Sequence, residues 1–137
     1  MEVILNKCYG ALELSDKAYL KWAEKLGAPI YTYAFDPRKN KCIKVDCLDS
    51  EYPYKTHVFI DYGDYLPKDF NSKAVLKFEN PDRTDLYLIE VVKELGKEAN
   101  GFYSDLKIVE IPDELADNYI IENYDGYETL HEKVQIW

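Results

Sequence analysis

An Asp-Gly pair near the end of the chain, between two runs rich in apolar and β-branched residues, constrains the fold more than any other feature. The stretch reads YIIENYDGYETLHEKVQIW and spans residues 119–137. Asp-Gly accommodates the two positive φ angles that a type I′ turn requires. We therefore predict a β-hairpin whose loop is Asp125 and Gly126, with Tyr124 opposite Tyr127.

The register of this hairpin decides which side chains share a face. It produces three further pairs, which are Glu122 with Thr129, Ile121 with Leu130 and Ile120 with His131. Alternation groups Leu130 with Val134 and Ile136 on one face. The other, more polar face carries Tyr127, Thr129, His131, Lys133 and Trp137. His131 then has Glu122 diagonally within reach, and a surface histidine beside a carboxylate is the ordinary explanation of such a pair.

The dipeptide His131-Glu132 does not indicate a zinc protease. That site needs H-E-x-x-H on a helix, so that two imidazoles share one face. Here residue 135 is Gln, and the stretch reads as a strand. We therefore expect no zincin chemistry from this segment.

Apolar periodicity and turn residues predict the rest of the fold. The elements are, in chain order, a strand at 2–5, a helix at 16–26, a hairpin of strands 30–35 and 42–47, a short strand at 57–60, a short helix near 72–77, a helix at 84–95 and a strand at 106–111. Ser15 offers the N-cap of the first helix, and Gly27 ends it. The chain is thus predicted to be a single α+β domain over 1–137, mostly an antiparallel sheet with two main helices packed on one face and a C-terminal β-hairpin.

The charge and composition restrict the partners. The net charge is −9, from 26 acidic and 17 basic residues. Because duplex binding gains affinity from clustered basic residues, we expect no nucleic-acid partner. No stretch approaches the ~20 apolar residues of a membrane span, and the start MEVILNK lacks the features of a signal peptide. With an odd count of 3 cysteines and no disulfide framework, we expect a cytoplasmic protein without a membrane partner.

Candidate catalytic and metal sites are sparse. Cys8 follows the first strand, where a nucleophile can sit, but nothing in the sequence places His57 or His131 beside it. A small buried or turn residue is the more common role for such a cysteine. A zinc site from Cys8, Cys42, Cys47 and His57 lacks a second closely spaced ligand pair. The phosphate-loop, dinucleotide and serine-esterase signatures are missing as well, so we expect no catalytic residue, metal or cofactor.

Arg83 offers one small-ligand site. It stands just before the second helix, where free backbone N–H groups add to its charge and can hold an anion. Lys7 lies at the end of the first strand, and the chain supplies 13 tyrosines on which a base or ribose could rest. Asp82 and Asp85 flank Arg83, so a plain ion pair at the helix N-terminus is the alternative.

Two passages together carry a resemblance. They are ILNKCYGALELSDKA, and DRTDLYLIEVVKELGKEANGFYSDLKIVEIPD followed by YIIENYDGYETLHEKVQIW. The motifs NKCYG, ELGKEANG, LKIVEIPD and NYDG occur in this order. Because of them, about the first 26 and the last 55 residues resemble a family of small, mostly uncharacterised proteins encoded by bacteriophages and prophages. The chain departs from the family pattern at Gly10-Ala11-Leu12, where Gly-Gly-Phe is expected, and at Asp85-Leu86, where Asp-Pro is expected.

The resemblance implies a context in the infected or lysogenic bacterial host. Such proteins are often accessory factors, and one class resembles sponges that bind a nucleotide-derived immune signal without cutting it. Our first hypothesis is a counter-defence sponge of this kind, a homo-oligomer whose ligand-binding residues are Asn6, Lys7, Arg83, Asn100, Tyr103, Tyr124, Tyr127 and His131. The alternative is a protein–protein inhibitor of a host or defence protein that uses the Tyr-rich loop 48–70 or the C-terminal hairpin. A third is an enzyme with a dispersed site on Cys8 or His131.

Overall fold

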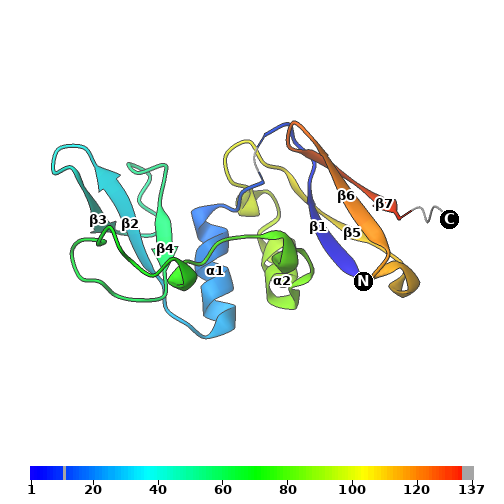
Figure 1. Ribbon diagram of the computed structural model, residues 1–137, viewed down its shortest axis with the longest axis horizontal. Coiled ribbons are helices and arrows are strands. Elements are labelled where there is room, and N and C mark those ends of the chain that lie inside the picture. The colour runs from blue at the N-terminus through cyan, green and yellow to red at the C-terminus, as the bar shows by residue number, and fades with distance from the viewer. Residues whose placement is uncertain (11, 134–137) are drawn as a thin grey trace. The chain divides into compact units, whose positions relative to one another are not determined.

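The computed structural model of the protein describes residues 1–10 and 12–133. Within that part of the chain, two α-helices and seven strands, all paired antiparallel, form an α+β fold with a C-terminal β-hairpin (Figure 1). The predicted fold class is therefore confirmed. Residue contacts group the chain into two compact units, one formed by residues 1–18 with those from 78 onward and the other by Tyr19–Lys77. That the chain is a single domain stays a prediction.

The first unit contains two antiparallel strand pairs. β1 (Glu2–Asn6) pairs with β5 (Leu106–Glu110), and β6 (Tyr119–Tyr124) pairs with β7 (Tyr127–Glu132). The hairpin has the predicted register throughout, including Tyr124 opposite Tyr127, and its loop residues Asp125 and Gly126 have φ angles of 49° and 95°. The predicted hairpin is therefore confirmed, although Val134, Ile136 and Trp137 lie outside the described residues.

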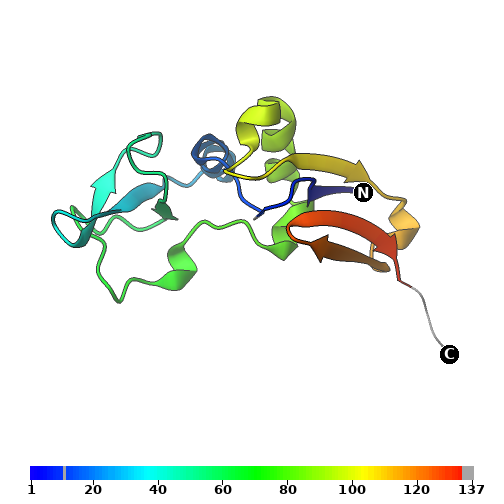
Figure 2. The same cartoon turned by 90° about the horizontal axis from the view of Figure 1, so that it is seen from above.

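Both faces of β1 are buried, which makes this strand the centre of the first unit. Val3, Ile4 and Leu5 are almost fully shielded from solvent. Val3 and Leu5 pack with Ile111 in a cluster that hairpin residues cover, among them Ile121. Figure 2 shows the hairpin β6–β7 lying beside β1, and β1 and β7 are in contact. A strand with no exposed face explains the unbroken apolar run VIL in the sequence.

The helix α2 (Leu86–Leu95) contacts both β1 and β5. Asp85 is its N-cap, because its Oδ1 accepts a hydrogen bond of 2.9 Å from the Leu88 amide. The helix ends at Gly96 with a positive φ, and its buried residues are Leu88, Ile89, Val91 and Val92. Three 3₁₀ helices complete the first unit, namely η2 (Asn80–Thr84), η3 (Gly96–Ala99) and η4 (Asp113–Leu115).

The second unit is built on a small antiparallel sheet. Its strand order is β3 (Lys41–Val45), β2 (Tyr31–Asp36) and β4 (Thr56–Val58), with a short 3₁₀ helix η1 (Ser72–Ala74) in the following loop. The helix α1 (Asp16–Leu26) precedes this sheet. Ser15 Oγ accepts from the Ala18 amide at 3.1 Å, and Gly27 has a φ of 72°, so the predicted start and end are confirmed.

The long connection over 48–80 is held to the sheet of the second unit. The Tyr33 hydroxyl donates to the Gly63 carbonyl at 2.8 Å and accepts from the Tyr62 amide at 3.1 Å. Val58 forms a β-bridge with Val75. These contacts give parts of the irregular segment hydrogen-bonding partners.

The loop after β1 approaches the hairpin turn so closely that only glycines fit. A Cβ on Gly126 would lie 1.5 Å from the Gly10 carbonyl oxygen, and a Cβ on Gly10 would lie 2.4 Å from the backbone carbonyl oxygen of Tyr103. The NKCYG segment, the loop after η3 and the hairpin turn therefore meet at one end of the first unit. No described helix of the chain is long and apolar enough to cross a membrane.

Replacing Gly126 with alanine should destabilise the first unit, because the new Cβ collides with Gly10 and because φ is positive. Gly96→Ala is the matched control, since its φ is also positive but no atom lies within 4 Å of the added Cβ. In chemical denaturation, Gly126→Ala should cost about 1–3 kcal/mol more than the control, the usual range for overpacking. Equal losses would show that the NKCYG segment can move away.

Candidate functional site

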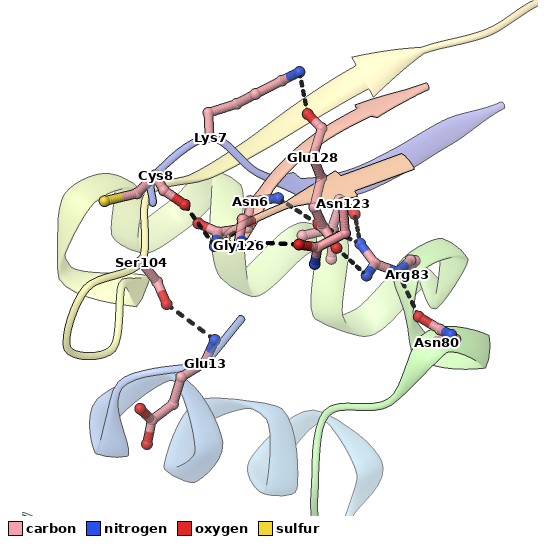
Figure 3. Close-up of polar contacts among 11 residues, drawn as sticks. Asn6, Lys7, Cys8, Glu13, Asn80, Arg83, Ser104, Asn123, Gly126 and Glu128 are labelled. Carbon is pink, nitrogen blue, oxygen red and sulfur yellow. Dashed lines mark hydrogen bonds and ion pairs between the residues drawn. The ribbon is translucent and has the colours of Figure 1, made fainter. Parts of the chain in front are cut away.

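A buried ion pair between Arg83 and Glu128 lies at the centre of the first unit. The two residues are only 5% and 2% exposed. The guanidinium holds the carboxylate with two nearly parallel hydrogen bonds, Nη1 to Oε1 at 2.7 Å and Nη2 to Oε2 at 2.6 Å (Figure 3). This bidentate geometry matches the planar fork of arginine to a carboxylate and is the strong form of the interaction.

The turn before α2 positions Arg83. The 3₁₀ helix η2 begins with a capping box between Glu79 and Asp82, and it has proline near its N-terminus. Arg83 Nε donates to Asn80 Oδ1 at 3.0 Å, and Nη1 also donates to the Ile4 carbonyl at 3.0 Å. The guanidinium is thereby fixed between the turn, strand β1 and strand β7.

The aspartates that flank Arg83 are not its partners. Asp82 Oδ2 accepts from the Glu79 amide at 2.9 Å, and Asp85 Oδ1 accepts from Leu88. Burial, and beyond it the negative charges of Asp85 and Glu79, raise the pKa of the Asp82 carboxyl, although the Glu79 amide partly opposes this. The alternative of a plain local ion pair was therefore wrong, because backbone N–H groups at two helix starts use these carboxylates.

Asn6 joins four segments of the first unit and has no exposed surface. Its backbone amide donates to Glu128 Oε1 at 2.8 Å. Its side-chain Nδ2 donates to the carbonyls of Cys8 and Gly126, at 3.2 and 3.0 Å, and its Oδ1 accepts from the Asp105 amide at 2.9 Å. Both N–H groups of the side chain are used inside the protein, so Asn6 supports the fold around the ion pair.

Lys7 lies against the backbone of the hairpin. Its ammonium donates to the Glu128 carbonyl at 2.5 Å and sits 5.0 Å from the centre of the Tyr127 ring. Figure 3 shows that the Glu128 side chain points the other way, toward Arg83. Asn100, another predicted ligand-binding residue, accepts from the Leu106 amide at 2.8 Å through Oδ1.

The predicted aromatic residues are mostly on the surface. Tyr103 and Tyr124 are 79% and 73% exposed. Tyr9, which we did not predict as a site residue, stacks on Tyr127 at 5.4 Å and meets the edge of Tyr124 at 6.4 Å between ring centres. Tyr9, Tyr124 and the half-buried Tyr127 form a group of rings near the hairpin turn, which we call the exposed aromatic cluster.

His131 is a surface residue on the polar face of β7. Its Nε2 lies 3.5 Å from Glu122 Oε2, the predicted diagonal partner, and 2.9 Å from Thr129 Oγ1. Among the described residues, no three metal-ligating side chains gather into a cluster. Within the described residues, Cys8 Sγ contacts just the neighbouring Tyr9 carbonyl, at 4.0 Å, while Cys47 Sγ lies 3.9 Å from the buried His57 Nδ1.

A pocket of about 510 Å³ opens beside the ion pair. Its lining consists of Asn80, Arg83, Ala116, Asp117, Tyr119, Ile121, Asn123 and Glu128. Of the residues predicted from the sequence, Arg83 alone is in this lining. Of the other predicted residues, Asn6 donates to Glu128 of the ion pair, and Lys7 lies against the Tyr127 ring of the exposed aromatic cluster, which also contains Tyr124. Asn100, Tyr103 and His131 are not part of the pocket lining.

The sequence held a signal for Glu128 that we did not use. Alternation from Leu130 places Glu128 on the apolar face of β7, where a carboxylate needs a partner. Asp117, Asn80 and Asn123 gave no such signal, because polar residues in turns and at strand ends are ordinary.

Several polar groups of the lining remain available to a ligand. Asn123 Oδ1 accepts from the Gly126 amide at 2.8 Å, which leaves its NH₂ group without a partner in the described part of the chain. The carboxylate of the exposed Asp117 has no hydrogen bond there either. The pocket thus combines amide donors and carboxylate acceptors with the apolar surfaces of Ala116 and Ile121.

Comparison of the chain with protein-family models, with curated proteins and with solved structures gave no match. A function therefore has to be argued from the chemistry of the site and cannot come from a relative.

Removing one member of the ion pair should be far more costly than removing both. Arg83→Met or Glu128→Leu leaves a buried unpaired charge, and each should cost about 3–5 kcal/mol. The double variant should cost much less than the sum, with a remainder from the lost hydrogen bonds to Ile4 and Asn6. Urea denaturation of the four proteins measures this coupling, and additive losses would contradict it.

Proposed function

We propose that this protein binds a small nucleotide-derived signal of the bacterial host in the pocket beside Arg83 and Glu128, and that it holds the signal without converting it. The pocket itself carries the proposal, since a buried charge pair forms its wall and unpaired polar groups face a cavity of about 510 Å³. Sites for small ligands usually measure ~300–1,000 Å³ and combine apolar walls with a few polar groups. The resemblance to phage-encoded proteins supports a counter-defence role in the host cytoplasm.

The lining residues support sequestration over catalysis. They include no Cys, Ser, Thr, Lys or His, so the lining offers no thiol, aliphatic hydroxyl or amine nucleophile and no imidazole base. The groups that remain are the Tyr119 hydroxyl and the carboxylates of Asp117 and Glu128. Of the two carboxylates, Glu128 is tied to Arg83 by two hydrogen bonds and to Asn6 by a third. A group fixed in this way positions a ligand and is badly placed to move a proton.

The proposed homo-oligomer has one structural argument in its favour. Strand β6 contributes Tyr119, Ile121 and Asn123 to the lining. In the described part of the chain, β6 pairs with β7 alone, so no described strand occupies its outer edge. A second copy at this edge would add side chains next to the pocket.

A second candidate function is inhibition of a host or defence protein by direct contact. The exposed aromatic cluster favours it, because Tyr9 is 66% exposed and stands beside the still more exposed Tyr124. Clustered tyrosines are typical of the energetic centre of protein interfaces. In loop 48–70, Tyr54 is also strongly exposed.

Asp117→Asn should reduce retention of the ligand, because it removes a charged acceptor from the pocket without disturbing a described contact. Asp69→Asn is the matched control, since Asp69 is also an exposed aspartate but belongs to the second unit. Native mass spectrometry after incubation with ADP-ribose and cyclic nucleotides should show a bound mass for wild type and the control. Asp117→Asn should show it weakened about tenfold, as expected for one charged hydrogen bond. An apo mass for wild type with every compound would refute the proposed function.

A further inference from the structure

We infer that the pocket binds the nucleobase or carboxamide end of its ligand and leaves the phosphates outside. This inference rests on the proposed function and specifies which part of the ligand the site recognises. It follows from an inventory of the hydrogen-bonding groups around the ion pair and from the balance of charge in the lining.

Arg83 has one donor left for a ligand. A guanidinium has five N–H groups. Four of them are used, by Asn80 Oδ1, the Ile4 carbonyl and the two Glu128 oxygens. The fifth, on Nη2, has no partner among the described residues, although Arg83 is only 5% exposed and lines the pocket. A donor that is buried without a partner is costly, so the pocket is where this N–H obtains an acceptor from water or a ligand.

The unused N–H lies on the same edge of the guanidinium as Nε–H. Because Nε–H donates to Asn80 Oδ1, an acceptor bound to Nη2 comes close to the Asn80 carboxamide. The NH₂ group of Asn80 has no described partner and can donate to the same ligand atom. This arrangement suits a carbonyl oxygen or a ring nitrogen.

Acceptors stand close to this donor. Glu128 Oε1 accepts two hydrogen bonds, from Arg83 and from the Asn6 amide, whereas Oε2 accepts one. A carboxylate oxygen has two lone pairs, so Oε2 can accept a further bond. It thus presents an acceptor directly beside the Nη2 donor. Asp117 adds a second carboxylate to the lining.

A group with an acceptor next to a donor matches this pair. Carboxamides and amino-substituted nucleobases such as adenine and cytosine have such an edge, and their flat rings can rest on Tyr119 and Ile121. A site that hydrogen-bonds a particular polar edge rejects molecules that lack it, since its own groups would remain unpaired.

The charge of the lining opposes a phosphate. Arg83 is the single cation among the lining residues, and Glu128 already neutralises it at 2.6 Å, while Asp117 adds another negative charge. An anion would therefore meet two carboxylates and a guanidinium whose charge is balanced. The sequence predicts that Arg83 contacts an anion. The present inference gives it a different role, in which it donates a hydrogen bond to an uncharged acceptor atom of the ligand.

The test is isothermal titration of the full chain with five probes, which are adenosine, cytidine, nicotinamide riboside, ribose 5-phosphate and pyrophosphate, with ADP-ribose as the composite ligand. The inference expects at least one nucleoside to bind and to compete with ADP-ribose. Ribose 5-phosphate and pyrophosphate should not compete. Binding should change less than about twofold between low and physiological salt, since no phosphate contact contributes.

Variants complete the test. Asp117→Asn should weaken the nucleoside about tenfold, whereas Asp69→Asn should leave it unchanged. ADP-ribose binding that pyrophosphate displaces and nucleosides do not displace would overturn the inference and leave the proposed function standing. Failure of wild type to bind ADP-ribose, the cyclic nucleotides and all five probes would overturn both. Nucleoside binding that Asp117→Asn does not alter would place the site elsewhere and also overturn the inference.

Discussion

The ion pair between Arg83 and Glu128 organises the first unit. It connects the turn before α2 to β7, and through Ile4 and Asn6 it reaches β1. Taking two charges out of water costs several kcal/mol per ion, and such a pair gains little over a well-packed apolar one. The ion pair instead fixes how these segments are positioned, because each carboxylate oxygen of Glu128 accepts hydrogen bonds from particular donors. The pocket exists beside this arrangement, so fold and candidate site depend on the same contact.

The hydrogen bonds around the ion pair agree with the proposed role of binding a ligand without converting it, because they fix the side chains of the site. Asn6 uses both side-chain N–H groups within the protein, and the close approach of Gly10 and Gly126 holds the adjoining loop. Binding to such a prearranged site loses little conformational entropy, which favours tight retention of a small ligand. The exposed aromatic cluster at the same end of the unit is a separate surface, suited to a protein partner.

The sequence predicted the local parts of the fold well. The hairpin register followed from Asp125-Gly126 and strand alternation, and the ends of α1 followed from Ser15 and Gly27, because all of these depend on neighbouring residues. The candidate site was harder, since Arg83 and Glu128 are separated by 44 intervening positions and each looks like a surface charge. The nearby carboxylates of Asp82 and Asp85 suggested a local ion pair with Arg83, but both accept hydrogen bonds from backbone amides. A pocket between a turn, a loop and a strand face has no signature in one sequence.

The central claim is that the pocket beside Arg83 receives the ligand, and NMR of the Arg83 side chain tests it most directly. Because the guanidinium is buried and hydrogen-bonded, its N–H signals should be observable and separable from those of the exposed Arg38. Titration with ADP-ribose should shift the Arg83 side-chain signals together with the amides of Tyr119 and Asn123. Shifts confined to Tyr103, Tyr124 and their neighbours, with Arg83 unchanged, would contradict the account.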